Sequence, residues 1–545
     1  MSNKTLLYII CVLMGMATAV GCSSDKPTYL EPRLNTLDAT DITRTTATLH
    51  GTVSLEGETD MPKLLFRYGT TESMDLFTAE VQPQGAEVNL PIEGLTAGTT
   101  YYYVLEGSNG RITTTGNVMS FTTQPNVNPT LQPLSLLSHG PTSAIVTYEI
   151  SDDGGEPVTE TGCYVYLTDA PESKRKCVVD NFDGSVGKQK LRIGDLQRNS
   201  NYQMVPFAKN SVGETTGDPV SYTTSDAVVL DEAGELKMLM GDNLYDLTSL
   251  SLAGAMNGDD LSCLRQMMGR DPSGAATEGK LTDIDMTDVE IVSGGGPYGA
   301  SRYVQDGVIG QGLFADCDKL TRVTLPTSAT TLEKDAFEGC TSLRKIVIAA
   351  NIRSLLPSSG CTTLEDISVS SANANYSSQD GVLLNAGGTE IVWFPMGKKG
   401  EYTLPSTVTA IADYAFKECS IETFRFPDGL KTLGQGAFMD SQVKEVSLPD
   451  QLKQIPTGTF QNCTQLQVVR LGSKIELITA YAFDQCPLTD LYVGAEFPPV
   501  CEANAFSFSK GTSFTSTCVL HVPAGTKKAY QAHSKWKIFT HITEN

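Results

Sequence analysis

The sequence predicts a multidomain, mainly β protein in which two tandem β-sandwiches are followed by a solenoid with capped ends. In the first part, short alternating apolar runs are separated by turn residues at roughly 8–12-residue spacing, the pattern of β-sandwiches. In the second part, beyond Asp226, one apolar pattern recurs every 22–23 residues, a period typical of a solenoid. The length of 545 residues also predicts several domains, because a chain of this length rarely folds around one compact core.

The N-terminus has the features of an export signal. Lys4 is followed by an apolar run from Leu6 to Val20, and these fifteen residues are fewer than the about 20 that span a bilayer. The run ends in Ala19-Val20-Gly21-Cys22, which resembles a bacterial lipobox with Ala in place of the usual Leu. The resemblance implies that residues 1–21 are a lipoprotein signal peptide and that Cys22 carries the lipid. The alternative is an ordinary signal peptide in which Cys22 is incidental.

Residues 22–30 are expected to form a linker. Ser23-Ser24-Asp25-Lys26 resembles the short acidic stretch that sends lipoproteins of the Bacteroides group to the outer leaflet. We therefore expect a lipid-anchored protein of the outer membrane, exposed on the cell surface; the motif leaves open which leaflet carries the anchor. No other apolar segment approaches the length of a membrane span, so the lipid is the expected contact with the membrane.

The two sandwiches are predicted by a repeat of 101 residues. Leu95 stands six residues before Tyr101, and Leu196 stands six residues before Tyr202. The pattern resembles the fibronectin type III family, in which this Tyr hydroxyl ties its strand to the preceding turn. The resemblance implies one sandwich over residues 31–125 and a second over residues 126–226.

The solenoid is predicted over residues 227–545 by phased Phe and Cys positions. One coil cannot bury these side chains alone, but stacked coils share a continuous core. The pattern resembles the BspA-type leucine-rich repeats of bacterial surface proteins. The Phe positions are Phe314, Phe337, Phe416, Phe438, Phe460, Phe483 and Phe506. Cys follows three residues later at Cys317, Cys340, Cys419, Cys463 and Cys486, and Ser441 and Ser509 take that place in two coils.

Further features of the solenoid are expected from its sequence. Residues 376–395 are predicted to form an inserted hairpin. A strand over residues 247–252 and a helix over 261–268 are predicted to cap one end, and a helix from Thr526 to Trp536 the other. Because each coil packs mainly on its neighbours, residues 227–545 are expected to fold without the sandwiches.

The cysteines of the repeat are expected to be free, buried thiols. The 13 Cys include no C-x-x-C pair, so the spacing of a zinc ribbon is missing. In-register neighbours point the same way, which is poor geometry for a bridge. Cys163 with Cys177, and Cys501 with Cys518, could each be bridged across neighbouring strands, because export allows disulfides without requiring them.

Composition and motifs argue against an enzyme and against nucleic-acid binding. The net charge of −23 provides no basic footprint for nucleic acid. Gly294 to Gly299 fits G-x-G-x-x-G, but Pro297 removes an N–H and no helix is predicted to follow. With five His and no H-E-x-x-H or G-x-S-x-G motif, we assign no catalytic residue, no metal and no cofactor. Trp393 and Tyr101-Tyr102-Tyr103 are predicted to pack in the core, with Tyr102 outward, rather than to stack on a carbohydrate.

The sequence thus predicts a non-enzymatic, monomeric surface protein that binds a macromolecule through its solenoid and uses the sandwiches as a stalk. The expected partner is a host or bacterial surface protein or a glycan. The alternative is glycan capture for a polysaccharide-uptake system, which a row of exposed aromatic side chains would favour. Binding is expected at outward positions of the solenoid strands, where basic and hydroxyl groups predict salt-sensitive contacts. The candidate residues are Arg322, Thr324, Arg344, Lys345, Arg425, Lys444 and Arg470.

Overall fold

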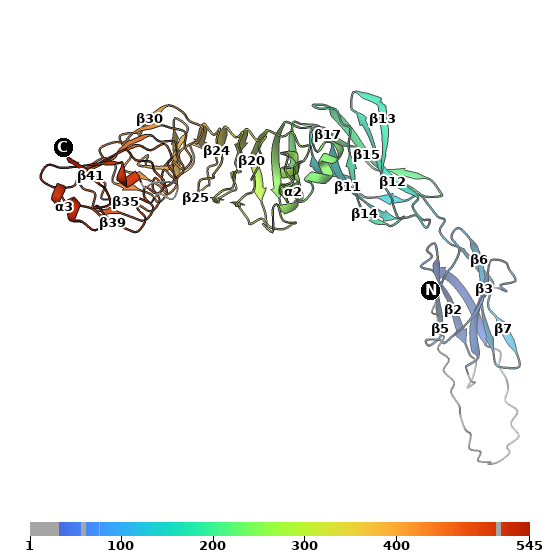
Figure 1. Cartoon of the computed structure of the whole chain (residues 1–545). Coiled ribbons are helices and arrows are strands. Elements are labelled where there is room, and N and C mark those ends of the chain that lie inside the picture. Colours follow the sequence, from blue (N-terminus) through green and yellow to red (C-terminus); the bar gives the residue numbers. More distant parts are fainter. Residues whose placement is uncertain (1–31, 56–60, 76, 508–513) are drawn as a thin grey trace, which may run out of the picture. The chain divides into compact units, whose positions relative to one another are not determined.

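The computed structural model describes residues 32–55, 61–75, 77–507 and 514–545 of the chain. Its regular secondary structure consists mainly of strands joined by turns and loops, and its few helices are short (Figure 1). The chain divides into two compact units, the first made mainly of residues up to Asn128 and the second of most residues from Pro129 to Asn545. The prediction of a mainly β chain, with sandwiches before a solenoid, is confirmed.

The first unit contains a β-sandwich of two antiparallel sheets. One sheet has the order β1-β2-β5, and the other has the order β4-β3-β6-β7 with β8 paired to β6. Alternation directs every second side chain inward, as in β2, where Ala47, Leu49 and Val53 are buried. The strands are β1 (Arg33–Thr40), β2 (Thr46–Ser54), β3 (Lys63–Gly69), β4 (Phe77–Val81), β5 (Glu87–Glu93), β6 (Thr100–Ser108), β7 (Thr113–Thr115) and β8 (Met119–Thr122).

The second unit begins with another β-sandwich of the same kind. One of its sheets runs β14-β11-β10 with β9 paired to β11, and the other runs β13-β12-β15-β16 with β17 paired to β15. Val146, Tyr148 and Ile150 of β11 are buried at alternate positions. The strands are β9 (Thr130–Leu131), β10 (Ser135–His139), β11 (Ala144–Asp152), β12 (Glu160–Leu167), β13 (Ala170–Val178), β14 (Gly187–Ile193), β15 (Asn201–Lys209), β16 (Glu214–Thr216) and β17 (Val220–Thr223).

The predicted corner tyrosine is present in both sandwiches. The Tyr101 hydroxyl accepts a hydrogen bond from the backbone N–H of Thr96 at 2.9 Å. The Tyr202 hydroxyl accepts one from the backbone N–H of Gln197 at 2.8 Å. The 101-residue sequence repeat therefore corresponds to a repeated turn-to-strand tie, which confirms the prediction.

The solenoid places longer parallel strands on one side and two-residue strands on the other. The longer strands follow the order β18-β19-β20-β22-β24-β26 and, after a break, β30-β32-β34-β36-β38-β40-β41. They are β18 (Ala227–Leu230), β19 (Ser249–Met256), β20 (Asp283–Ile291), β22 (Arg322–Thr324), β24 (Lys345–Ile348), β26 (Asp366–Val369), β30 (Glu401–Thr403), β32 (Thr423–Arg425), β34 (Glu445–Ser447), β36 (Val468–Leu471), β38 (Asp490–Val493), β40 (Val519–Val522) and β41 (His541–Glu544). The short strands are β21 (Val308–Ile309), β23 (Thr331–Leu332), β25 (Ser354–Leu355), β31 (Ala410–Ile411), β33 (Thr432–Leu433), β35 (Gln454–Ile455), β37 (Leu477–Ile478) and β39 (Val500–Cys501).

The phased Phe side chains stack on one another between these two sides. The ring of Phe438 lies 4.8 Å from that of Phe416 and 5.3 Å from that of Phe460, centroid to centroid, with nearly parallel planes. In the coil without a Phe, buried Ser358 instead accepts a hydrogen bond from the backbone N–H of Phe337 at 3.1 Å. The stacked core predicted from the repeat is confirmed.

The insertion between coils is a hairpin, as predicted. β27 (Tyr376–Gln379) and β28 (Val382–Asn385) are antiparallel and joined by Asp380-Gly381. These two residues have φ values of 52° and 74°, and positive φ at both central positions defines the type I′ turn that hairpins favour. β29 (Glu390–Trp393) pairs with β28 and runs parallel to the short strand β31. The hairpin therefore joins the short-strand side of the solenoid.

The C-terminal end is capped by buried aromatic side chains. The Tyr530 hydroxyl donates to the carbonyl of Ala495 at 2.6 Å, and Trp536 Nε1 donates to that of Pro499 at 2.8 Å. The predicted helix was too long, because α3 (Lys527–Ala532) ends where His533 adopts an extended backbone. The remaining helical elements are α1 (Leu236–Met240), α2 (Gly258–Met267) and the 3₁₀ turns η1 (Gly241–Asn243) and η2 (Phe514–Ser516).

At its N-terminal end, the solenoid is joined to the second sandwich by a shared sheet. β18 pairs with β10 of the sandwich through His139 and Val229, and on its other side it runs parallel to β19. Ile145 of β11 is fully buried within the core of the solenoid. The predicted cap, now seen as β19 and α2, therefore does not end the sheet: the sandwich covers its edge.

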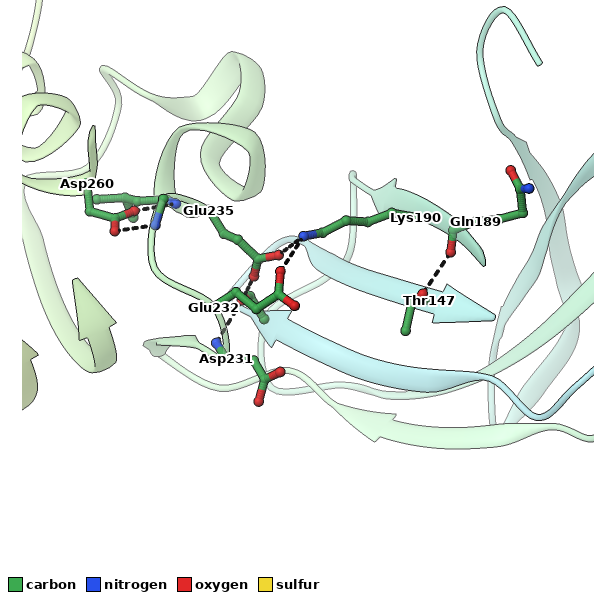
Figure 2. A network of polar contacts seen from close by, with 10 residues as sticks. Thr147, Gln189, Lys190, Asp231, Glu232, Glu235 and Asp260 are labelled. Carbon is green, nitrogen blue, oxygen red and sulfur yellow. Dashed lines mark hydrogen bonds and ion pairs between the residues drawn. The ribbon is translucent and has the colours of Figure 1, made fainter. Parts of the chain in front are cut away.

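Polar contacts reinforce this junction (Figure 2). Lys190 forms an ion pair with Glu232 at 2.9 Å and a second with the buried Glu235, which also accepts a hydrogen bond from Ser138. On the solenoid side, the buried Asp260 carboxylate accepts hydrogen bonds from three backbone N–H groups, at distances of 2.5 to 3.0 Å. Burial raises the pKa of Asp260, and the three N–H groups oppose that rise. They replace much of the hydration that the carboxylate loses.

The helix α1 adds backbone contacts across the same junction. The carbonyl of Leu239, near its C-terminus, accepts hydrogen bonds from Ser143 at 2.7 Å and from Arg192 Nε at 3.0 Å. Arg192 Nη2 also donates to the carbonyl of Met240 at 3.2 Å. These last carbonyls of a helix have no partner inside it, so the sandwich supplies the donors that they need.

The described cysteines are free thiols, as predicted for the repeat positions. Cys463 and Cys486 are buried and donate to the carbonyls of Phe438 and Phe460, at 3.0 and 2.9 Å. Cys163 and Cys177 lie directly opposite each other in β12 and β13, and both are free, as are Cys501 and Cys518. Cys22 lies outside the described residues, so its lipidation stays a prediction.

Candidate functional site

The solvent-facing residues of the longer strands, from β19 to β41, form what we call the strand face. Neighbouring strands are in register, so equivalent residues line up in rows across the coils. Arg322 of β22 lies beside Lys345 of β24, and Thr324 lies beside Val347. Such rows present the same side-chain position again and again to a ligand.

The structure brings the predicted binding residues together in two groups. Arg322, Thr324 and Lys345 lie on β22 and β24, and Arg344 directly precedes β24. The second group lies beyond the break in the strand sheet: Arg425 is on β32, Lys444 directly precedes β34, and Arg470 is on β36. The seven residues therefore do not form one continuous stripe.

Most of these basic residues are already paired with a carboxylate from a neighbouring coil. Across the strand face, each pair joins strands or loops that are adjacent in the stack. The pairs are Arg344 with Glu365 at 3.7 Å, Lys345 with Asp366 at 2.7 Å, Arg425 with Glu401 at 3.8 Å, Lys444 with Glu422 at 2.7 Å, and Arg470 with Glu445 at 3.3 Å.

The pairing changes the electrostatics that the sequence predicts for this face. Each of these pairs is substantially exposed to solvent, so each stabilises the fold by only about 0–1 kcal/mol. A nearby carboxylate nevertheless cancels most of the positive potential that the base alone would project. The strand face is therefore a surface of paired charges and not a basic stripe.

The strand face is interrupted between β26 and β30. β26 pairs with β24 and β30 pairs with β32, and these two strands end separate sheets. The inserted hairpin occupies the break. The N–H of Ile367 in β26 donates to the carbonyl of Gly381 in the hairpin turn at 2.9 Å, and β29 then pairs with the short strand β31.

A cleft of about 470 Å³ lies at this break. Two of its lining residues, Lys398 and Lys399, were not among the predicted site residues. Among the described residues, no carboxylate lies within the 4.0 Å ion-pair distance of either amine. Their position depends on where the sheet breaks, and the only signal in the sequence is the run Gly397-Lys398-Lys399-Gly400. The lining is Glu365, Gly397, Lys398, Lys399, Glu401, Tyr402 and Ile421.

A second cluster missed at the sequence level lies near the C-terminal end of the strand face. The guanidinium of Arg470 lies 4.1 Å from the ring centroid of Tyr492, and the other neighbour of that ring is His521, with centroids 4.0 Å apart and planes at 7°. His521 Nε2 lies 3.0 Å from Asp490 Oδ1, and this hydrogen bond lowers the pKa of Asp490. Because both faces of Tyr492 are covered, only its edge is available to a ligand.

The residues considered for sugar stacking are mostly core residues. Trp393, Tyr101 and Tyr103 are buried, and Tyr102 is half-buried on the other face of its strand, as predicted. Within the described part of the chain, no group of three or more His, Cys, Asp and Glu side chains is arranged to hold a metal ion. In the same residues, no helix has the length and apolar character needed to cross a membrane.

Comparison with known proteins assigns the repeats. A family model described as the BspA type leucine rich repeat region matches residues 305–380 and 397–512 in six copies. The coils in these ranges therefore match BspA-type leucine-rich repeats, and they follow two β-sandwiches. No curated protein matches the chain.

Several solved structures resemble parts of the chain. A leucine rich cell surface protein from Faecalibacterium prausnitzii is 18% identical, with 57% of this chain and 94% of that one covered and a TM-score of 0.32. A leucine-rich repeat protein from Eubacterium ventriosum is also 18% identical, with 56% and 94% covered and a TM-score of 0.31. A two-domain fibronectin type III segment of chicken tenascin is 19% identical, with 35% and 97% covered and a TM-score of 0.21.

Proposed function

We propose that this protein is a non-enzymatic binding protein of the bacterial cell surface, anchored by a lipid on Cys22 and engaging a macromolecular ligand through the solenoid. The observation that carries the proposal is the strand face, an extended surface on which side chains recur in register over successive coils. Such a surface suits a long ligand held by many weak contacts. The Faecalibacterium protein is described as a cell surface protein, which supports the same location for this chain.

A polysaccharide-uptake role has less support. It would be favoured by a row of exposed aromatic side chains, and three of the four aromatic residues suggested by the sequence lie in the core instead, namely Trp393, Tyr101 and Tyr103. The sandwiches are proposed to serve as the stalk, and the working state is proposed to be a monomer without a cofactor.

The anchor and the binding function are tested together by Cys22→Ala in the full chain. Whole cells that carry the unchanged chain are expected to be labelled by antibody and to adhere to at least one surface of an array of host proteins and glycans. Cells with Cys22→Ala are expected to lose both properties, because the thiol that accepts the lipid is missing. Ser23→Ala serves as the control and should change neither.

Two results would contradict the proposal. Unchanged lipid labelling of the Cys22→Ala chain would show that Cys22 does not carry the lipid. If cells display the unchanged chain but adhere to no arrayed protein or glycan, the proposed binding function is contradicted.

A further inference from the structure

We propose that the cleft between β26 and β30 binds an acidic sugar unit of a polysaccharide, with its anionic group held by Lys398 and Lys399. This inference rests on the proposed function, since it names the ligand chemistry of one place on the strand face. It starts from the cleft of about 470 Å³, which is large enough for a monosaccharide unit.

The charges around the cleft favour an anion. The two carboxylates of the lining, Glu365 and Glu401, are each paired with an arginine that is not part of the lining, Arg344 and Arg425. The two cations of the lining, Lys398 and Lys399, form no ion pair among the described residues. Their positive charge is local, since the whole chain has a net charge of −23. A site of this kind concentrates an anionic ligand against the repulsion of the rest of the molecule.

The backbone fixes the position of the two lysines. The N–H of Gly397 donates to the carbonyl of Leu364 at 2.7 Å. A Cβ at residue 397 would lie 2.5 Å from the carbonyl carbon of Thr363, so only glycine allows this close approach. Lys398 is half-buried next to this contact. Burial would raise the pKa of Asp366, but hydrogen bonds from Lys345 and Ser368, together with the charges of Lys345 and Lys398, lower it overall.

The other groups of the cleft favour a sugar over an acidic peptide. Glu365 and Glu401 can accept hydrogen bonds from hydroxyl groups, which a sugar has in number and an acidic side chain lacks. Burial raises the pKa of Tyr402 to about 12, so its phenol stays protonated at neutral pH and can donate. Ile421 borders the cleft but is 1% exposed, so it belongs to the core and offers no contact to a ligand. Cations, acceptors and a phenol together match a sugar ring that carries both an acid and hydroxyls.

The experiment measures binding of the full chain to four immobilised polymers. Polygalacturonate carries carboxylates, dextran sulfate carries sulfates, dextran is neutral, and polyglutamate is an acidic peptide. Binding is expected to polygalacturonate, dextran sulfate or both, which distinguishes the two acid groups, and it should exceed binding to dextran and polyglutamate by about tenfold. Raising the salt concentration should weaken it.

Variants locate the site. Lys398→Gln combined with Lys399→Gln should weaken binding by about tenfold, because the charges of the two unpaired amines are lost. Lys527→Gln combined with Lys528→Gln removes the same charge from an adjacent surface pair on α3 and should leave binding unchanged. Circular dichroism melting of both variants should match the unchanged chain, since neither lysine of the cleft forms an ion pair that the fold would lose.

Three outcomes would overturn the inference. They are binding to neither acidic polysaccharide, equal loss in both double variants, and binding to polyglutamate as tight as to the polysaccharides, which would assign the cleft to acidic peptides. Adhesion of cells that display the chain is measured separately. The inference about the cleft can therefore be contradicted while the proposed function still holds.

Discussion

A chain shortened to residues 227–545 is expected to aggregate, whereas a chain of residues 129–545 is expected to be a soluble, cooperatively folding monomer. The first cut leaves β18 without β10, exposes the buried Leu239 that lies near Gly140, and removes Ser143 and Arg192 from the carbonyls of α1. An unpaired sheet edge next to apolar side chains is a site of association. The sequence alone predicted that residues 227–545 would fold without the sandwiches, and the shared sheet reverses that expectation.

The measurement is sedimentation velocity combined with thermal unfolding of both chains. The longer chain is the control, because it keeps the whole junction and lacks most of the first unit. A monomeric 227–545 chain with the same melting temperature as 129–545 would show that the junction contributes little.

Phe438→Ala is expected to lower the free energy of unfolding by about 3–5 kcal/mol, the usual cost of deleting a buried Phe. Phe438 is fully buried and its ring lies between those of Phe416 and Phe460, so its loss leaves a cavity inside the stack. Tyr481→Ala is the matched control: Tyr481 is an aromatic residue of the same solenoid with an exposed fraction of 41%, and its loss should cost about 0.5 kcal/mol or less.

Denaturant unfolding of the full chain, followed by circular dichroism, measures the difference between the two variants. An unchanged transition for Phe438→Ala, together with lost ligand binding, would make this Phe a contact residue instead of a core residue.

Local pattern was enough to predict the repeats. The spacing of Leu95 and Tyr101 identifies a turn-to-strand tie formed within a few residues, and the structure confirms it. The period of the Phe positions likewise predicts their stacking, because coils of equal length place equivalent residues above one another. Such features depend on neighbours that the sequence pattern itself specifies.

Contacts between segments that are not related by the repeat could not be predicted from the sequence. Nothing in Ala227-Val228-Val229-Leu230 reveals that this strand pairs with His139, about ninety residues earlier, and not only with the next coil. The candidate basic residues were chosen one strand at a time, and their acidic partners lie on adjacent coils, as Glu445 does for Arg470. Lys398 and Lys399 gained their position from the inserted hairpin, whose effect on the sheet is a property of the assembled fold.

The central claim, that the ligand is held on the strand face, is tested most directly by adhesion of cells displaying variants of the full chain. The test variant combines Arg322→Glu, Arg344→Glu and Arg425→Glu, and the control combines Lys431→Glu, Lys453→Glu and Lys474→Glu, which changes the same charge beside the short strands. These residues are exposed, so both variants should keep the fold. We predict that adhesion is lost in the test variant and kept in the control. Full adhesion of the test variant, with loss on deletion of residues 31–125, would contradict the account by placing the ligand on the first sandwich.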